Sequence, residues 1–100
     1  MIMKATRIKM KSGSRYSNDL LEIDEIYVTG WVAAGYYYKL DGYYKKADIH
    51  DHLKDHPDTI QVDIYPYPQC VPAKSIYGEK YVRSEPNNTT KDNLLELPRD

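Results

Sequence analysis

Apolar and polar residues alternate along residues 2–10, a spacing of two that is typical of a β-strand with one buried face. Arg7 and Lys9 fall on the opposite face, and Lys11 follows them. The glycine and serines at 12–14 then predict a turn or a loop. The chain therefore opens with a strand whose exposed side carries cations.

Three later segments are also rich in strand-forming residues. Between 20 and 38, β-branched and aromatic residues predict one or two strands, with glycines marking bends or a turn. Residues 59–65 alternate most clearly, and the prolines after them predict an extended edge or a loop at 65–68, because proline has no N–H to donate. Residues 75–77 and 80–84 predict two more strands joined by a turn.

Residues 46–56 have the spacing of a helix instead. Ile49 and Leu53 lie four residues apart on one face, and acidic and basic residues occupy the other. Pro57 ends the segment, since the residue before a proline disfavours the helical conformation.

The order of these elements predicts a single α+β domain over 1–100, in which a mostly antiparallel sheet of four to five strands is covered on one face by the helix. Near the C-terminus, Asp92 or Asn93 can cap one helical turn whose leucines close the core. A length of 100 residues suits one domain and excludes large enzyme scaffolds.

Composition narrows the functional classes. The 14 basic and 15 acidic residues give a net charge of −1, which argues against a general binder of polyanions. The single cysteine, Cys70, cannot form an intramolecular disulfide, which favours a reducing compartment. Because no apolar stretch is long enough for a signal peptide or a membrane span, we expect a soluble cytoplasmic protein with no membrane partner.

Candidate catalytic and metal-binding residues are few. His52 and His56 are four residues apart, with His50 and Asp48 nearby, and that spacing can place two imidazoles on one metal ion. Two ligands do not complete a site, so we favour surface or helix-capping histidines. Cys70 has no base beside it in the sequence, and a small, partly buried apolar residue is the favoured interpretation. We therefore predict no enzyme activity, no cofactor and no metal.

Tyrosine is unusually frequent, with 11 tyrosines and no phenylalanine. These rings can replace phenylalanine at the rim of the core, contact another protein, or stack on bases. We favour a non-enzymatic protein-binding module, whose partner is another protein or a second copy. Its predicted interaction surface consists of Trp31, Tyr36, Tyr37, Tyr38, Tyr65 and Tyr67.

An alternative is a domain that binds single-stranded nucleic acid. Arg7, Lys9 and Lys11 would contact phosphates while tyrosines stack on bases, at about 1–3 kcal/mol per base. The neutral overall charge makes this the less favoured function. An enzyme that uses Cys70 or the histidines ranks third.

The C-terminal third resembles a known family. Tyr-Val-Arg-Ser at 81–84, followed by Asp-Asn-Leu-Leu-Glu-Leu-Pro at 92–98, is similar to the ending of the small bacterial proteins grouped as domain of unknown function 3892. The order of the earlier elements also fits. The sequence differs in having no cysteine after Pro98, serine instead of threonine at 84, and an inserted Tyr-Pro-Tyr-Pro. The resemblance implies a compact, cytoplasmic bacterial domain without established activity, cofactor or catalytic residues.

Overall fold

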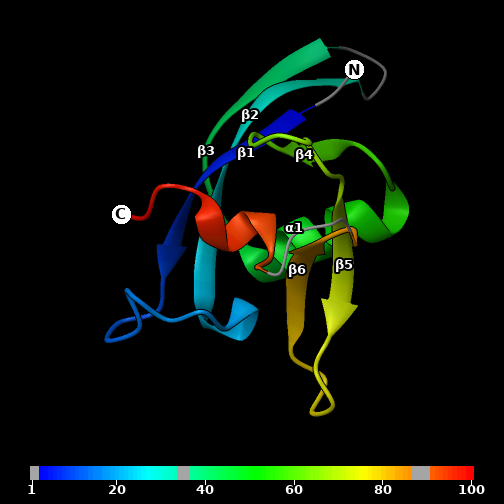
Figure 1. Cartoon of the computed structure of the whole chain (residues 1–100). Coiled ribbons are helices and arrows are strands. Elements are labelled where there is room, and N and C mark those ends of the chain that lie inside the picture. Colours follow the sequence, from blue (N-terminus) through cyan, green and yellow to red (C-terminus); the bar gives the residue numbers. More distant parts are fainter. Residues whose placement is uncertain (1–2, 34–36, 87–90) are drawn as a thin grey trace.

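The structure is a computed structural model that describes residues 3–33, 37–86 and 91–100, without the side chains of residues 33–38. A four-stranded sheet has the order β3-β2-β1-β4, and a separate hairpin pairs β5 with β6 (Figure 1). β2 is antiparallel to both of its neighbours, and β4 is parallel to β1. The strands are β1 (Met3–Met10), β2 (Ile23–Ala33), β3 (Tyr37–Lys45), β4 (Ile60–Val62), β5 (Cys70–Lys74) and β6 (Lys80–Ser84).

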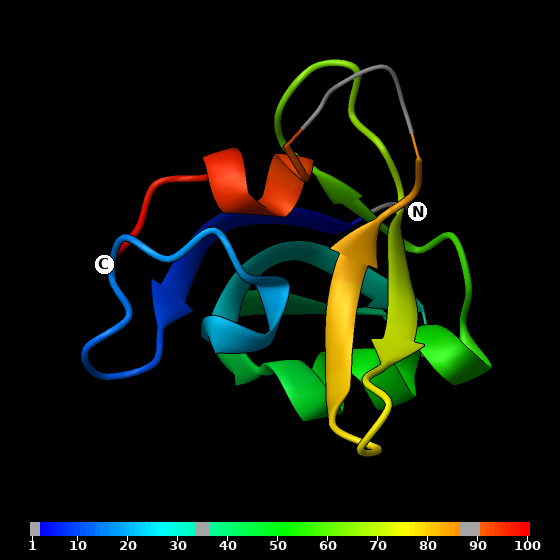
Figure 2. The ribbon, with the colours of Figure 1, turned by 60° about the horizontal axis from the view of Figure 1, so that its bottom comes forward.

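Within the described residues, the strands are accompanied by one α-helix and two short 3-10 helices. Helix α1 (Lys46–Asp55) follows β3 directly and packs against both strands of the hairpin and against β2 and β3 (Figure 2). The 3-10 helices are η1 (Leu20–Glu22), before β2, and η2 (Asn93–Glu96), near the C-terminus. The predicted α+β class with one main helix is confirmed, although the six strands of the described chain are divided between two sheets.

The core lies between the main sheet, α1, the hairpin and η2. Its members have alternating or helical spacing, so each element contributes one apolar face. The buried side chains are Met3, Ala5, Ile8, Met10, Ile23, Ile26, Val28, Ile49, Leu53, Ile60, Val62, Cys70, Val82, Leu94, Leu95 and Leu97.

A β-bulge in β1 decides which side chains reach this core. Met3 and Ala5 are buried at odd positions, whereas Ile8 and Met10 are buried at even positions. The pairing register of β1 with β2 shifts between Ala5 and Arg7, so the extra residue restores the apolar side to the same face. The exposed side of the strand therefore carries Arg7 as predicted.

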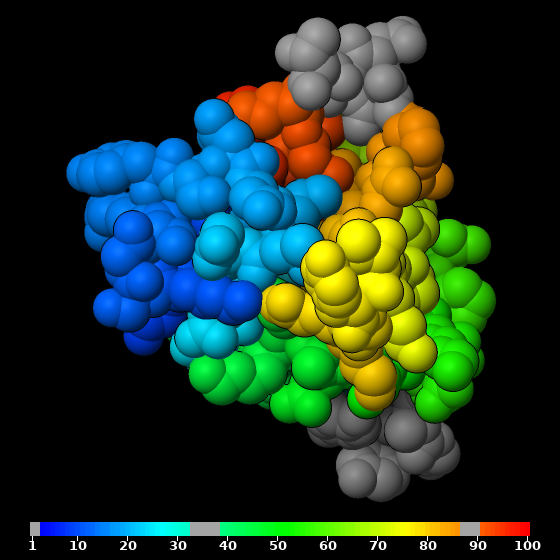
Figure 3. Space-filling view, turned by 90° about the horizontal axis from the view of Figure 1, so that it is seen from below, coloured from blue at the N-terminus to red at the C-terminus, as the bar shows by residue number. Residues whose placement is uncertain are grey.

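The buried ammonium of Lys46 ties the hairpin to the rest of the fold. Its Nζ donates to the carbonyl of Leu21 at 2.6 Å and to Oε2 of Glu79 at 2.5 Å. Lys11 Nζ donates to the same carboxylate oxygen at 3.1 Å, and these two ammonium groups hold the pKa of Glu79 below its usual range. Lys11 belongs to the segment after β1, and Lys46 belongs to α1. Figure 3 shows the hairpin between these two parts of the chain.

The predicted C-terminal turn is confirmed, with Asp92 as its cap. Its Oδ1 accepts from the backbone N–H of Leu94 at 2.9 Å, and its Oδ2 accepts from that of Ser84 at 3.0 Å. The same carboxylate thus starts η2 and attaches it to the end of β6.

One sequence-based assignment is wrong, the strand at 75–77. Residues 75–77 form a turn, because the Ser75 hydroxyl accepts from the backbone N–H groups of Tyr77 and Glu79. The strand lies earlier, at Cys70–Lys74, and includes Pro72. Because β5 pairs only with β6, the missing N–H of this proline does not interrupt a ladder on its other side.

The β4 side of the main sheet, which we call the closed edge, is covered by three short segments. β4 pairs with the first half of β1, and residues 68–69 lie outside β4, where Val62 N donates to Pro68 O at 2.9 Å. Residues 98–100 pair with the second half of β1, through Ile8 N to Pro98 O at 3.0 Å and Asp100 N to Ile8 O at 3.1 Å. No stretch of the described β1 longer than a few residues is left uncovered on this side.

Candidate functional site

The opposite side of the main sheet, which we call the open edge, is the outer side of β3. β3 pairs with β2 in an uninterrupted register from Tyr37, opposite Ala33, to Lys45, opposite Glu25. It contains no proline, and no other segment of the described chain forms backbone hydrogen bonds with it. Alternate N–H and C=O groups along nine residues therefore face away from the sheet, which is the template for adding another strand.

The side chains beside the open edge alternate in sign. Lys39, Asp41 and Lys45 are exposed and lie on the face of the sheet opposite the core, with Tyr43 between the last two. The hydroxyl of Tyr27, on β2, donates to Oδ1 of Asp41 at 2.6 Å. This carboxylate is thus held in place next to the exposed backbone.

Part of the predicted aromatic surface lies at this edge. Trp31 on β2 is opposite Lys39 and is half exposed. The backbones of Tyr37 and Tyr38 begin β3, but their side chains lie outside the described part of the structure, as does the whole of Tyr36.

The other two predicted aromatic residues lie elsewhere. Tyr65 and Tyr67 are exposed in the loop after β4, with ring centroids 6.1 Å apart in an edge-to-face arrangement. β1 separates β4 from β2. Trp31 lies near the start of β1, whereas the loop with the two tyrosines follows the end of β4, which runs parallel to β1. The structure therefore does not bring this pair together with Trp31.

The three cations of the alternative nucleic-acid face each contact a carboxylate. Arg7 Nη2 lies 2.5 Å from Asp100 Oδ1, and Asp100 also accepts a hydrogen bond from the hydroxyl of Tyr43. The guanidinium and this hydroxyl hold the pKa of Asp100 below its usual range. Lys9 and Lys11 lie 4.0 Å from Glu25 and 3.1 Å from Glu79, respectively, so none of the three charges stands alone.

Two of the three helical histidines lie close together. The rings of His52 and His56 are 5.0 Å apart, and burial together with His56 lowers the pKa of His52. His50 is buried, with Nδ1 3.0 Å from Asp51 Oδ1. Within residues 3–33, 37–86 and 91–100, no three His, Cys, Asp or Glu side chains gather in a way that could hold a metal ion.

Cys70 is buried at the start of β5, where it pairs with Ser84. Burial raises the pKa of its thiol to about 12, with a smaller contribution from the charge of Asp92. A thiol of this kind stays protonated at neutral pH and is a poor nucleophile.

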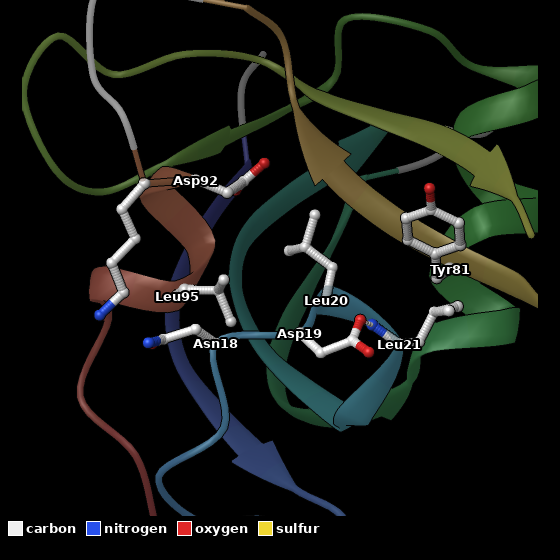
Figure 4. Close-up of a pocket in the computed structure, with 8 residues that line it drawn as sticks. Asn18, Asp19, Leu20, Leu21, Tyr81, Asp92 and Leu95 are labelled. Atoms are coloured by element: carbon white, nitrogen blue, oxygen red, sulfur yellow. Dashed lines mark hydrogen bonds between the residues drawn. The ribbon is translucent and has the colours of Figure 1, made fainter.

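A pocket of about 600 Å³ opens between η1, η2 and β6. Figure 4 shows the side chains of Leu20 and Leu95 in the middle of the pocket and Tyr81 at one side. Both carboxylates of its lining are engaged, because Asp19 accepts from Leu21 N at 2.9 Å and Asp92 caps η2. The lining thus combines apolar side chains with carboxylates that already accept backbone hydrogen bonds.

Two similar sequence segments mark this pocket. Residues 18–22 read Asn-Asp-Leu-Leu-Glu, and residues 92–96 read Asp-Asn-Leu-Leu-Glu. Each segment forms a 3-10 helix capped by its aspartate, and both helices line the same hollow.

No helix in the described parts of the chain is both long and apolar enough to cross a membrane.

Comparison with known proteins gives one match. A family model described as "Protein of unknown function (DUF3892)" matches residues 36–98. No curated protein and no solved structure matches the chain. The matched range contains β3, α1, β4, the hairpin and η2, and it includes both parts of the C-terminal motif. The chain therefore belongs to the DUF3892 family of proteins of unknown function.

Proposed function

We propose that the chain is a non-enzymatic protein-binding module that binds an extended segment of its partner along the open edge. The observation that carries the proposal is the nine-residue length of β3, whose outer backbone groups are unpaired within the described chain. Strand addition uses main-chain hydrogen bonds for affinity, and the neighbouring side chains provide specificity.

The flanking side chains suit this mode of binding. Trp31 is a half-exposed aromatic residue one strand away from the edge, and large aromatic side chains are common anchors of protein interfaces. Lys39 and Asp41 offer charges of opposite sign on the same face, so a partner strand needs complementary charges.

We do not extend the proposal to single-stranded nucleic acid. Arg7, Lys9 and Lys11 each face a carboxylate, and a phosphate would have to displace these contacts. The net charge of −1 adds no general attraction for a polyanion.

We place the module in the cytoplasm. Its one cysteine is a buried thiol, which a reducing compartment suits.

Site-specific photo-crosslinking tests the proposal. A benzophenone amino acid replaces Lys39 at the open edge, Tyr67 in the loop after β4, or Lys54 on the exposed side of α1, in the full chain expressed in a bacterial host. We expect protein crosslinks from position 39, reduced by Trp31→Ala, and background levels from position 54. Crosslinks from position 67 without any from position 39 would overturn the assignment to the open edge, as would background levels at position 39.

A further inference from the structure

We infer that the strand bound by the open edge is β3 of a second copy of this chain, antiparallel and related by a twofold axis at Leu40. This inference rests on the proposed function and names the occupant of the same edge. An edge strand that pairs with its own copy forms an isologous interface, in which each contact occurs twice.

The geometry of strand pairing allows few registers. Because the outward backbone groups come from alternate residues of β3, each residue must pair with a residue of the same parity. A twofold axis can then pass through any one residue of the strand, and the choice of that residue fixes every pair.

Charge and length select the axis at Leu40. In that register Lys39 of each copy faces Asp41 of the other, and residues 37–43 of both copies pair. An axis at Lys39 or Asp41 places that charge opposite its own copy, and an axis at Gly42 places Lys39 opposite Lys45. Like charges directly opposite each other on adjacent strands destabilise the pair.

Among the other axes, the one at Tyr43 also pairs opposite charges, with Asp41 opposite Lys45. It pairs only residues 41–45, because α1 begins at Lys46 and removes the next residues from the strand. Lys45 already lies 3.3 Å from Asp24, which competes for its charge. The axis at Leu40 therefore gives the longest pairing in which all charges are complementary.

The inner face of the sheet is compatible with this axis. Leu40 is half-buried and packs against the core. In the inferred dimer it faces its own copy across the new ladder, so the apolar face of one sheet continues into the next. On the outer face, the hydrogen bond from Tyr27 positions the Asp41 carboxylate beside the edge.

Charge reversal tests the inference. The molar mass of the purified chain is measured by light scattering and sedimentation over a dilution series. We expect a dimer for the wild type, and a dissociation constant raised by about tenfold or more for Lys39→Asp and for Asp41→Lys, because each change places like charges opposite each other at two symmetric positions. The double variant Lys39→Asp/Asp41→Lys should restore the dimer.

Controls separate this effect from unfolding and from general charge. Lys54→Asp, on the exposed side of α1, changes the net charge by the same amount as Lys39→Asp and should leave the dissociation constant unchanged. The neutral variants Lys39→Gln and Asp41→Asn give a second test that does not depend on reversal, and each should weaken the dimer less than the reversed charge does. A monomer at every concentration, or a dimer that the single reversals do not weaken, would overturn the inference.

The crosslinking experiment keeps the two proposals apart. A crosslink from position 39 to another copy supports both. A crosslink from position 39 to a different protein, together with a monomeric purified chain, overturns self-pairing and leaves the binding function standing. Background crosslinking at position 39 overturns both.

Discussion

The two edges of the main sheet differ in how far other segments cover their backbone hydrogen-bonding groups. At the closed edge, β4, residues 68–69 and residues 98–100 each cover a short length, and two of the covering carbonyls belong to Pro68 and Pro98. Because the N–H and C=O of one strand residue point to the same side, each proline offers the covered strand an acceptor but no donor. At the open edge, β3 continues for nine regular residues without cover from the described chain.

This difference shows two strategies for controlling an exposed strand. A segment that covers an edge strand prevents other strands from pairing with it. Charged side chains on an uncovered edge strand select which strands can pair with it. The alternation of Lys39, Asp41 and Lys45 belongs to the second strategy. Changes at each edge, taken from the largest expected effect to the smallest, test whether the edges differ as sharply in stability as they do in structure.

Removing the C-terminal segment should have the largest effect. A chain that ends after Lys91 loses Leu94, Leu95 and Leu97, all of them buried, together with the cover of β1. Burial of such side chains contributes about 1.5–3 kcal/mol each, so we expect the free energy of unfolding in urea to fall by several kcal/mol. A chain that ends after Leu97 should lose much less, and an unchanged midpoint for the shorter chain would contradict the role of η2.

Arg99→Ala should have the next largest effect on the closed edge. The guanidinium donates to the backbone carbonyls of Arg15, Ser17 and Leu95 at 2.7, 2.8 and 2.9 Å. Leaving these acceptors unpaired should lower the free energy of unfolding by about 1–3 kcal/mol. Arg99→Lys keeps the charge but not the planar fork of donors, and its unfolding midpoint should lie between those of alanine and arginine. Equal midpoints for all three chains would show that this clamp is dispensable.

Acid should loosen the closed edge before the rest of the sheet. The pKa of Asp100 is lowered by Arg7 first and then by the Tyr43 hydroxyl, so its ionised form stabilises the fold at pH values above the unfolded pKa. This contribution is lost as the pH falls through the lower, folded-state pKa, in the region below about pH 4. Amide hydrogen exchange at Asp100 should accelerate there relative to residues of β2. In Asp100→Asn the additional acceleration should be absent, and its persistence would assign the effect to another group.

Asp41→Asn should have the smallest effect on folding. Its side chain is exposed at the open edge, and an amide oxygen can still accept from Tyr27. We expect the free energy of unfolding of the single chain to change by less than about 0.5 kcal/mol. A loss as large as that of Arg99→Ala would mean that the open edge is part of the stabilising framework.

The local sequence pattern was enough to predict an element whose buried face is marked by regularly spaced apolar residues. Helix α1 was predicted within a residue of its observed end, because Ile49 and Leu53 mark its buried side and Pro57 stops it. β3 was not predicted beyond Tyr38, since Lys-Leu-Asp-Gly at 39–42 has weak strand propensity on its own. The ladder with β2 supplies what the local sequence lacks.

Long-range contacts set the limit of prediction for the candidate site. The sequence indicated that Arg7, Lys9 and Lys11 share an exposed side, but two of their three carboxylates come from Asp100 and Glu79, far along the chain. No local sequence pattern predicts such long-range ion pairs. The bulge in β1 was equally hidden, because simple alternation assigns its two halves to opposite faces.

The pairing of residues 98–100 with β1 also has a consequence for the order of synthesis. A ribosome completes β1, β2 and β3, a meander of neighbouring strands, before it makes the segments that cover the outer side of β1. A nascent chain at that stage presents two open edges instead of one, and it is then most exposed to wrong pairing with other nascent copies. The state with a single open edge is therefore reached only after residues 98–100 have been made.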